Sequence, residues 1–184
     1  MKATGIVRRI DELGRVVIPK EIRRTLRIRE GDPLEIFVDR EGGVILRKYS
    51  PIGGLGDFAR EYAESIHQSV GHTAVICDRD SVVAVSGVGR KELLDRPVNE
   101  EIEQLMNNRM RISACAADGE RLIPITMEET GEKYTAELMI PIIASGDTVG
   151  AVILLSKEEG ARFGQTDVKV CETAAGFMGR QMED

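Results

Sequence analysis

The sequence predicts an α+β protein with two domains, residues 1–52 and residues 53–184. Three observations support this prediction. Positive charge is concentrated near the N-terminus, where residues 2–29 hold nine Lys/Arg against three Asp/Glu, a net +6, although the whole chain carries −6. One proline and three glycines interrupt any regular pattern between Tyr49 and Gly56. Beyond this break, amphipathic helix patterns and apolar strand patterns are typical of an antiparallel sheet flanked by helices.

The two halves also differ in total charge. Residues 1–50 have 12 basic and 8 acidic side chains, net +4, whereas residues 51–184 have 13 and 23, net −10. A basic segment in an acidic protein is typical of a surface that binds polyanions. The sequence therefore predicts different electrostatic roles for the two domains.

The first elements form a predicted β-hairpin. Residues Thr4–Ile10 are rich in β-branched side chains, and Asp11–Gly14 has the composition of a turn. Arg15–Ile18 then forms a second short strand. This arrangement places arginines at the tip of the hairpin.

A short helix follows the hairpin. Pro19 suits the first position of a helix, and Glu21 complements the positive end of the helix dipole. Ile22 and Leu26 form an i, i+4 apolar pair that would pack inward. The outer surface of the helix would then be cationic, with Lys20, Arg23, Arg24 and Arg27.

A second hairpin completes the predicted N-terminal domain. Its strands are expected at residues 34–38 and 44–47, around a turn at Glu41–Gly43. Fifty residues with four short strands bury too little surface to be stable alone, so we expect the domain to dimerise. A two-fold dimer would also match the pseudo-two-fold symmetry of duplex DNA.

Three segments, Thr4–Arg8, Asp11–Pro19 and Glu21–Leu26, resemble the AbrB-type transition-state regulators of spore-forming bacteria. The resemblance covers residues 1 to about 51. It implies an interleaved, swapped-hairpin β-barrel dimer that contacts duplex DNA mainly through arginines. The DNA-binding residues implied by matching position are Arg8, Arg15, Arg23 and Arg24, with Arg9 as a weaker candidate and Lys2 as an outer contact.

We expect this domain to read the DNA backbone and its shape. The predicted helix is too short for a helix-turn-helix reader, and the segment lacks the Asn/Gln cluster of many base-edge contacts. Guanidinium groups would instead bind phosphates in a bidentate manner. The alternative is a solvated face whose arginines form ion pairs with Asp11, Glu12 and Glu21.

The second predicted domain begins with an amphipathic helix over residues 55–70, whose apolar positions are Leu55, Phe58, Tyr62, Ile66 and Val70. Two apolar strands follow at Thr73–Cys77 and Val82–Val85. Two longer strands are expected at Tyr134–Ile143 and Thr148–Leu155. These elements predict an antiparallel sheet flanked by helices.

The last predicted helix, from about Gln165 to Met182, allows two interpretations. Its apolar seam consists of Val168, Cys171, Ala175, Met178 and Met182. The seam packs either on the sheet of its own chain or on another chain, and the helix over residues 55–70 has the same two alternatives. Our hypothesis is that one or both helices join two DNA-binding dimers into a homotetramer.

The segment Met139–Ile153 resembles the central hairpin of GAF domains, a class of small-molecule sensors. The resemblance implies a domain for effector sensing, for tetramerisation, or for both. An unidentified small-molecule effector is therefore an expected partner, although a GAF-like fold with a filled cavity needs no ligand.

The sequence offers no positive sign of an enzyme, a cofactor or a metal site. The glycine-rich segment Ser86–Lys91 lacks the spacing of a phosphate-binding loop. His67 and His72 have no cysteine nearby at ligand spacing, and the carboxylates are dispersed. The three cysteines, Cys77, Cys115 and Cys171, are too far apart to suggest a disulfide framework, so we expect buried, reduced thiols.

These observations favour a DNA-binding transcription regulator of sporulation-type gene expression. The alternative is an antitoxin-like autorepressor, because swapped-hairpin domains also occur in toxin–antitoxin pairs. A toxin-wrapping tail would be flexible, whereas residues 55–184 have the patterns of a packed domain. We expect a cytoplasmic, nucleoid-associated protein, since no apolar run approaches the roughly 18 residues of a membrane helix and no signal-peptide pattern is present.

Overall fold

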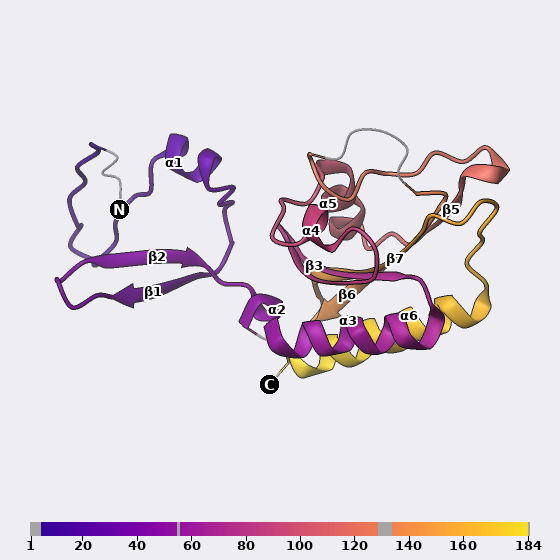
Figure 1. Cartoon of the computed structure of the whole chain (residues 1–184). Helices are drawn as coiled ribbons and strands as arrows, with labels where there is room; N and C mark the ends of the chain where they lie inside the picture. Colours follow the sequence, from indigo (N-terminus) through magenta and orange to yellow (C-terminus); the bar gives the residue numbers. More distant parts are fainter. Residues whose placement is uncertain (1–4, 55, 129–133, 184) are drawn as a thin grey trace. The chain divides into compact units, whose positions relative to one another are not determined.

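The computed structural model describes residues 5–54, 56–128 and 134–183, and it divides into two compact units between Tyr49 and Ser50. The first unit contains a helix, α1 (Lys20–Thr25), and two strands, β1 (Leu34–Val38) and β2 (Val44–Lys48) (Figure 1). The strands pair antiparallel, with Leu34 opposite Lys48 and Val38 opposite Val44. The predicted short helix and the second hairpin are therefore confirmed.

The first predicted hairpin has its turn but not its strands. The Asp11 N–H donates to the Arg15 carbonyl oxygen at 3.0 Å, and the Gly14 N–H donates to the Asp11 carbonyl oxygen at 3.0 Å. No strand occurs within residues 5–19, so the strands predicted at Thr4–Ile10 and Arg15–Ile18 are wrong for the single chain; Thr4 itself lies outside the described residues. An isolated two-stranded ribbon is marginal in water because it has no apolar layer to pack against.

The second unit is built on a five-stranded antiparallel sheet with the strand order β4-β3-β7-β6-β5. The strands are β3 (Thr73–Asp78), β4 (Val82–Ser86), β5 (Ile112–Cys115), β6 (Ala136–Ala144) and β7 (Asp147–Ser156). The helices are α2 (Pro51–Gly54), α3 (Gly56–Val70), α4 (Arg90–Leu93), α5 (Glu100–Asn107) and α6 (Gln165–Gln181), and a 3-10 turn spans Ala116–Asp118. The four predicted strands and both predicted helices of this unit are confirmed to within two residues at each described end.

Helices cover both faces of this sheet. Figure 1 shows α3 and α6 side by side along one face, where Ala63, Ile66 and Met178 belong to one apolar cluster with residues of the sheet. The opposite face has a second cluster, which includes Leu93 of α4 and Ile102 of α5. The sheet therefore separates two apolar cores.

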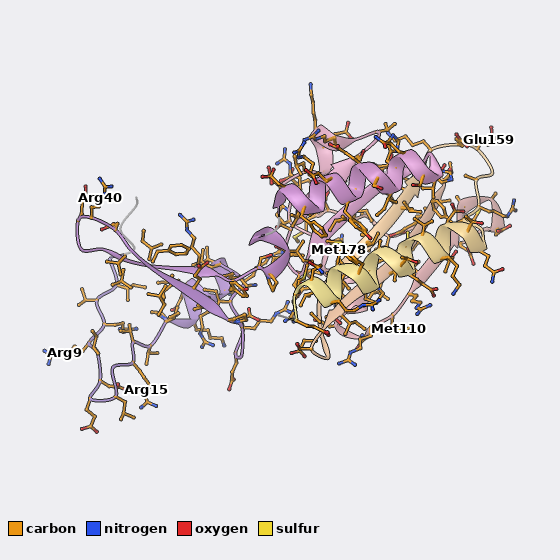
Figure 2. All side chains as sticks on the ribbon, turned by 90° about the horizontal axis from the view of Figure 1, so that it is seen from below. Arg9, Arg15, Arg40, Met110, Glu159 and Met178 are labelled. Atoms are coloured by element: carbon orange, nitrogen blue, oxygen red, sulfur yellow. The ribbon has the colours of Figure 1, made fainter. Side chains whose placement is uncertain are left out.

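The seam of α6 packs on its own sheet. Cys171, Ala175 and Met178 are buried, and Figure 2 labels Met178 on this helix. A Cβ added at Gly179 would collide with the carbonyl oxygen of Ile143, so α6 lies directly against β6. Of the two interpretations of this seam, the intramolecular one is confirmed, and another chain can reach only the outer face of the helix.

The segment Pro51–Gly54, where the sequence pattern is interrupted, belongs to the second unit. Pro51–Gly54 forms the helical turn α2, and Ile52 is fully buried in the core of the second unit. The Ser50 hydroxyl donates to an Asp78 carboxylate oxygen at 2.7 Å. The division of the structure therefore precedes the expected boundary at residues 52 and 53, because Ile52 has apolar neighbours only beyond that boundary.

Candidate DNA-binding surface

The turn at residues 11–15 is organised around the Asp11 carboxylate. Its Oδ1 accepts hydrogen bonds from the backbone N–H groups of Leu13, at 3.0 Å, and Arg15, at 2.8 Å. Its Oδ2 accepts a hydrogen bond from Nε of the Arg15 side chain at 2.9 Å. This is the Asx-type turn that aspartate favours, and it orients the arginine that follows it.

These donors change the acidity of the Asp11 carboxyl. The backbone and side-chain N–H groups of Arg15 hold its pKa below the ordinary value of 3.8, although the group lies in solvent. Asp11 is therefore ionised at neutral pH, and the Arg15 guanidinium has a permanent anionic partner.

The other candidate arginines are exposed or half-buried and lack such a partner. Arg8, Arg9 and Arg24 are exposed, and Figure 2 shows the labelled Arg9 and Arg15 extending away from the backbone of this segment. Arg8 makes only a long 3.4 Å contact to the neighbouring Val7 carbonyl oxygen. Within the described part of the chain, no carboxylate pairs with Arg8, Arg9, Arg23 or Arg24. Among the candidates Arg8, Arg9, Arg15, Arg23 and Arg24, the alternative of an ion-paired face therefore holds for Arg15 within the described residues.

Arg23 differs from its neighbour Arg24 in burial. Arg23 is half-buried on α1, and its Nε is enclosed by protein atoms without a hydrogen-bond acceptor among the described residues. Its backbone N–H donates to the Pro19 carbonyl oxygen at 3.0 Å, where α1 begins. The stem of Arg23 is therefore held by packing. Lys2, the outer contact, lies outside the described residues.

The apolar side chains of the first unit are not covered by its own chain. Between residues 5 and 49, the only buried residue is Pro19. The exposed large apolar side chains are Ile6, Val7, Ile10, Leu13, Val16, Val17, Leu26, Ile36, Phe37, Val38, Val44, Leu46 and Tyr49. The predicted inward packing of Leu26 is therefore not achieved in the single chain. An exposed apolar surface of this extent marks an interface.

The second unit shows no comparable set of exposed functional groups. All three cysteines are free and buried, as predicted, and burial raises the pKa of Cys77 and of Cys171 to about 12. The Nδ1 atom of His67 lies at hydrogen-bonding distance, 2.7 Å, from the His72 carbonyl oxygen. Within residues 5–54, 56–128 and 134–183, no group of three potential metal ligands occurs and no helix could span a membrane.

Similarity to known proteins extends over the whole chain. A family described as stage V sporulation protein T C-terminal, transcription factor, matches residues 54–183. Stage V sporulation protein T of Bacillus subtilis (strain 168) is 55% identical over 183 residues, which cover 100% of this chain and 99% of the relative. The chain belongs to the stage V sporulation protein T family. As a member of this family, it is a sporulation transcription factor.

Each half of this family member has further relatives. Its N-terminal region is 69% identical over 51 residues to the transition state regulatory protein AbrB of Bacillus subtilis, a match that covers 28% of this chain and 52% of AbrB. Residues 7–53 also match a family described as antidote-toxin recognition MazE, bacterial antitoxin. The GAF domain of an Acinetobacter phosphoenolpyruvate-protein phosphotransferase shares the fold, with a TM-score of 0.57 and 13% identity over 70% of this chain and 81% of that one. The expected AbrB-like and GAF-like halves are thus confirmed.

Sequence reasoning missed one feature of the candidate surface. It treated Asp11 as a turn residue or as an ion-pair partner, whereas the structure shows that its two oxygens do both at once. The spacing of Asp11, Gly14 and Arg15 could have indicated this, because an Asx turn brings the side chain at i+4 back towards the aspartate.

Proposed function

We propose that this protein binds duplex DNA through guanidinium groups of a dimeric N-terminal unit, with Arg8, Arg15, Arg23 and Arg24 as the principal contacts. Arg9 would be a weaker contact, and Lys2 an outer one. The supporting observation is a unit of net positive charge in which Arg8, Arg23 and Arg24 have no carboxylate partner within the described residues. Arg15 is bonded to Asp11 only through Nε, so its Nη groups also stay available there. Unpaired, exposed guanidinium groups are the geometry that bidentate phosphate recognition needs.

Dimerisation of the first unit is supported by its uncovered apolar side chains. A second copy would supply strands beside residues 5–19 and an apolar layer over the β1–β2 hairpin. We propose an interleaved dimer of this kind, since the apolar residues lie on both arms of the first turn and on both strands of the hairpin. The dimer would present two sets of arginines to one duplex.

Tetramerisation through the second unit is supported by three aromatic rings at the surface of α3 and α6. The rings of Phe58, Tyr62 and Phe177 lie with centroids 5.5 to 6.0 Å apart, and Tyr62 and Phe177 are nearly parallel at 6°. Phe177 is 39% exposed. Aromatic side chains of this kind dominate interface energetics. We propose that this cluster, rather than the buried α6 seam, joins two dimers.

Sedimentation of the full chain tests the tetramer. The wild type should sediment as a tetramer at micromolar concentration, and Phe177→Ala should shift it towards a dimer. Val88→Ala, which truncates an exposed apolar residue elsewhere on the second unit, should leave the tetramer intact. A wild-type dimer under these conditions would contradict the proposal.

The role in the cell follows from these contacts. We propose a cytoplasmic, nucleoid-associated regulator that activates or represses sporulation genes according to where its site lies relative to a promoter. Effector sensing by the GAF-like unit stays a prediction. We assign no catalytic step to the chain.

The salt dependence of DNA binding tests the arginine contacts. Each phosphate contact contributes about −0.9 to the slope of log K against log salt, so Arg15→Ala in both subunits should reduce the slope by about 1.8 and weaken binding. Arg40→Ala is the matched control, because Arg40 is an exposed arginine of the same unit in the turn between β1 and β2 (Figure 2). Equal slopes for both variants and the wild type would remove Arg15 from the contact set.

The match of residues 7–53 to an antitoxin family favours a second candidate function, an autorepressor that binds a toxin. A folded second unit speaks against it, because a toxin-wrapping segment is expected to be flexible. Limited proteolysis of the full chain separates the two functions. The regulator should yield a stable fragment that begins near residue 50, whereas rapid loss of residues 55–184 would favour the antitoxin.

A further inference from the structure

A carboxylate, that of Asp11, lies beside Arg15, one of the proposed DNA contacts, where it would repel phosphate. Asp11 lies four residues before Arg15 and is bonded to it, and both side chains are largely exposed, 41% and 70%. An ion pair this exposed contributes little to the stability of a folded protein. The backbone hydrogen bonds of the turn account for a side-chain oxygen at this position, which asparagine would also supply. They do not account for a negative charge beside a proposed DNA contact.

The geometry of the pair leaves most of the guanidinium available. Asp11 Oδ2 accepts a hydrogen bond from Nε of Arg15, and Oδ1 accepts from two backbone N–H groups of the same turn. The four N–H groups on the two Nη atoms of Arg15 form no hydrogen bond within the described residues. A guanidinium group is planar, so a bond at Nε also determines the direction in which its outer donors point.

We propose that Asp11 is a positioning residue of the DNA-binding surface, which holds the Arg15 side chain by Nε so that its Nη donors face a phosphate before DNA arrives. This inference rests on the proposed contact between Arg15 and DNA. An arginine has many rotamers, and ordering such a side chain on binding costs free energy that a preordered side chain has already lost. The favourable ordering outweighs the repulsion because solvent and salt screen the charge of an exposed carboxylate.

The neighbouring Glu12 provides a matched control. It has the same charge, lies in the same turn and is exposed, but it has no hydrogen bond or ion pair within the described part of the chain. Removing the charge of Glu12 reduces phosphate repulsion without changing Arg15. Removing the charge of Asp11 reduces the same repulsion and also releases Arg15.

The experiment measures the affinity of the full chain for a fluorescent duplex at fixed salt, with the variants Asp11→Asn, Glu12→Gln, Arg15→Ala and the double variant Asp11→Asn/Arg15→Ala. Asparagine keeps an oxygen for the backbone N–H groups of the turn, so the turn is retained. Glu12→Gln should bind DNA as tightly as the wild type or more tightly. Asp11→Asn should bind about three to ten times more weakly, the effect of leaving a long side chain unordered.

The double variant distinguishes positioning from a general effect on the fold. Once Arg15 is absent, Asp11→Asn should no longer weaken binding and should instead resemble Glu12→Gln. Tighter binding by Asp11→Asn in the otherwise unchanged protein, equal to that of Glu12→Gln, would overturn the inference. An unchanged affinity of Arg15→Ala would instead overturn the proposed contact of Arg15, so the two failures are distinguishable.

Side-chain relaxation measured by NMR gives a test without any substitution at Asp11. In the free protein, the Nε–H of Arg15 should be more ordered than the Nε–H of Arg40, which has no carboxylate partner within the described residues. An Arg15 Nε–H as mobile as that of Arg40 would overturn the inference even if Asp11→Asn failed to fold.

Discussion

The two units of this protein differ most in where their apolar side chains lie. In the first unit Pro19 is the only buried residue between residues 5 and 49, whereas the second unit has two apolar clusters on the two faces of its sheet. The second unit is a complete fold within one chain. If the first unit dimerises as proposed, another chain buries its exposed apolar side chains, and its stability and its DNA affinity should both depend on protein concentration.

The two units also differ in net charge: the first is basic and the second is acidic. Residues 1–50, which are net basic, are attracted electrostatically to duplex DNA, whereas the remainder of the chain, net −10, is repelled by it. A domain with this net negative charge is expected to add little DNA affinity of its own. Its contribution to affinity should come from the number of basic dimers that it holds together.

The largest expected effect is on the complete unit, at Gly150. A Cβ there would collide with the carbonyl oxygen of Cys77 and with the side chain of Ile52. Gly150→Ala should therefore destabilise the second unit by about 3 kcal/mol, measured by thermal or denaturant unfolding of the full chain.

Gly176→Ala is the control for this substitution, because an added Cβ in that helical position meets no atom within 4 Å. It should leave the second unit unchanged or stabilise it by about 0.5–1 kcal/mol. Equal unfolding transitions for the two variants would contradict the close approach of β7, β3 and α2 at Gly150.

A smaller effect is expected in the incomplete unit, at Val17. This side chain is 71% exposed in the single chain, so its replacement by serine would be nearly neutral if no partner covered it. If a second copy buries it, Val17→Ser should cost about 1–2 kcal/mol per subunit. Unfolding measured over a hundredfold range of protein concentration reports this cost, and Val88→Ser in the second unit, at an exposed position, should be without effect.

The smallest effect is the titration of Asp11. The Arg15 donors lower its pKa, so the ionised form is favoured by folding. Its stabilising contribution is complete above the ordinary pKa of 3.8 and is lost as the pH falls through the lowered value. The carboxyl carbon resonance of Asp11 should therefore titrate below pH 3.8, and in Arg15→Ala its midpoint should move upward. An unchanged midpoint would exclude the bond to Nε in solution.

Several elements could be predicted because their signal is local. The turn at Asp11, the helix after Pro19 and the β1–β2 hairpin depend on residues within four or five positions of one another. The long strands β6 and β7 were also predicted, because their apolar runs are longer than any turn. By contrast, α4, α5 and β5 were not predicted, because residues 90–115 combine short elements with charged side chains and acquire their form only by covering one sheet face.

The helical turn α2 at Pro51–Gly54 was not predicted either, and the reason is again a contact that is distant in the sequence. Pro51 and the glycines after it have the composition of a linker, but Ile52 is fully buried and α2 forms beside it. The side chain of Ile52 packs against Gly150 of β7, and this contact outweighs the local preference for a loop. Such a long-range contact leaves no trace in the composition of the segment.

By itself, the sequence determined that the chain has a basic half and an acidic half, where the turn before Arg15 lies and which arginines are candidates for DNA. The first two conclusions depend on charge and on neighbours along the chain, whereas the candidate arginines follow from the resemblance to AbrB-type regulators. Only the tertiary structure decided that the α6 seam faces its own sheet, that Phe58, Tyr62 and Phe177 gather at the surface, and that Asp11 holds Arg15 by Nε. Each of these depends on the direction of a side chain in space, which is set by packing and hydrogen bonds rather than by residue order.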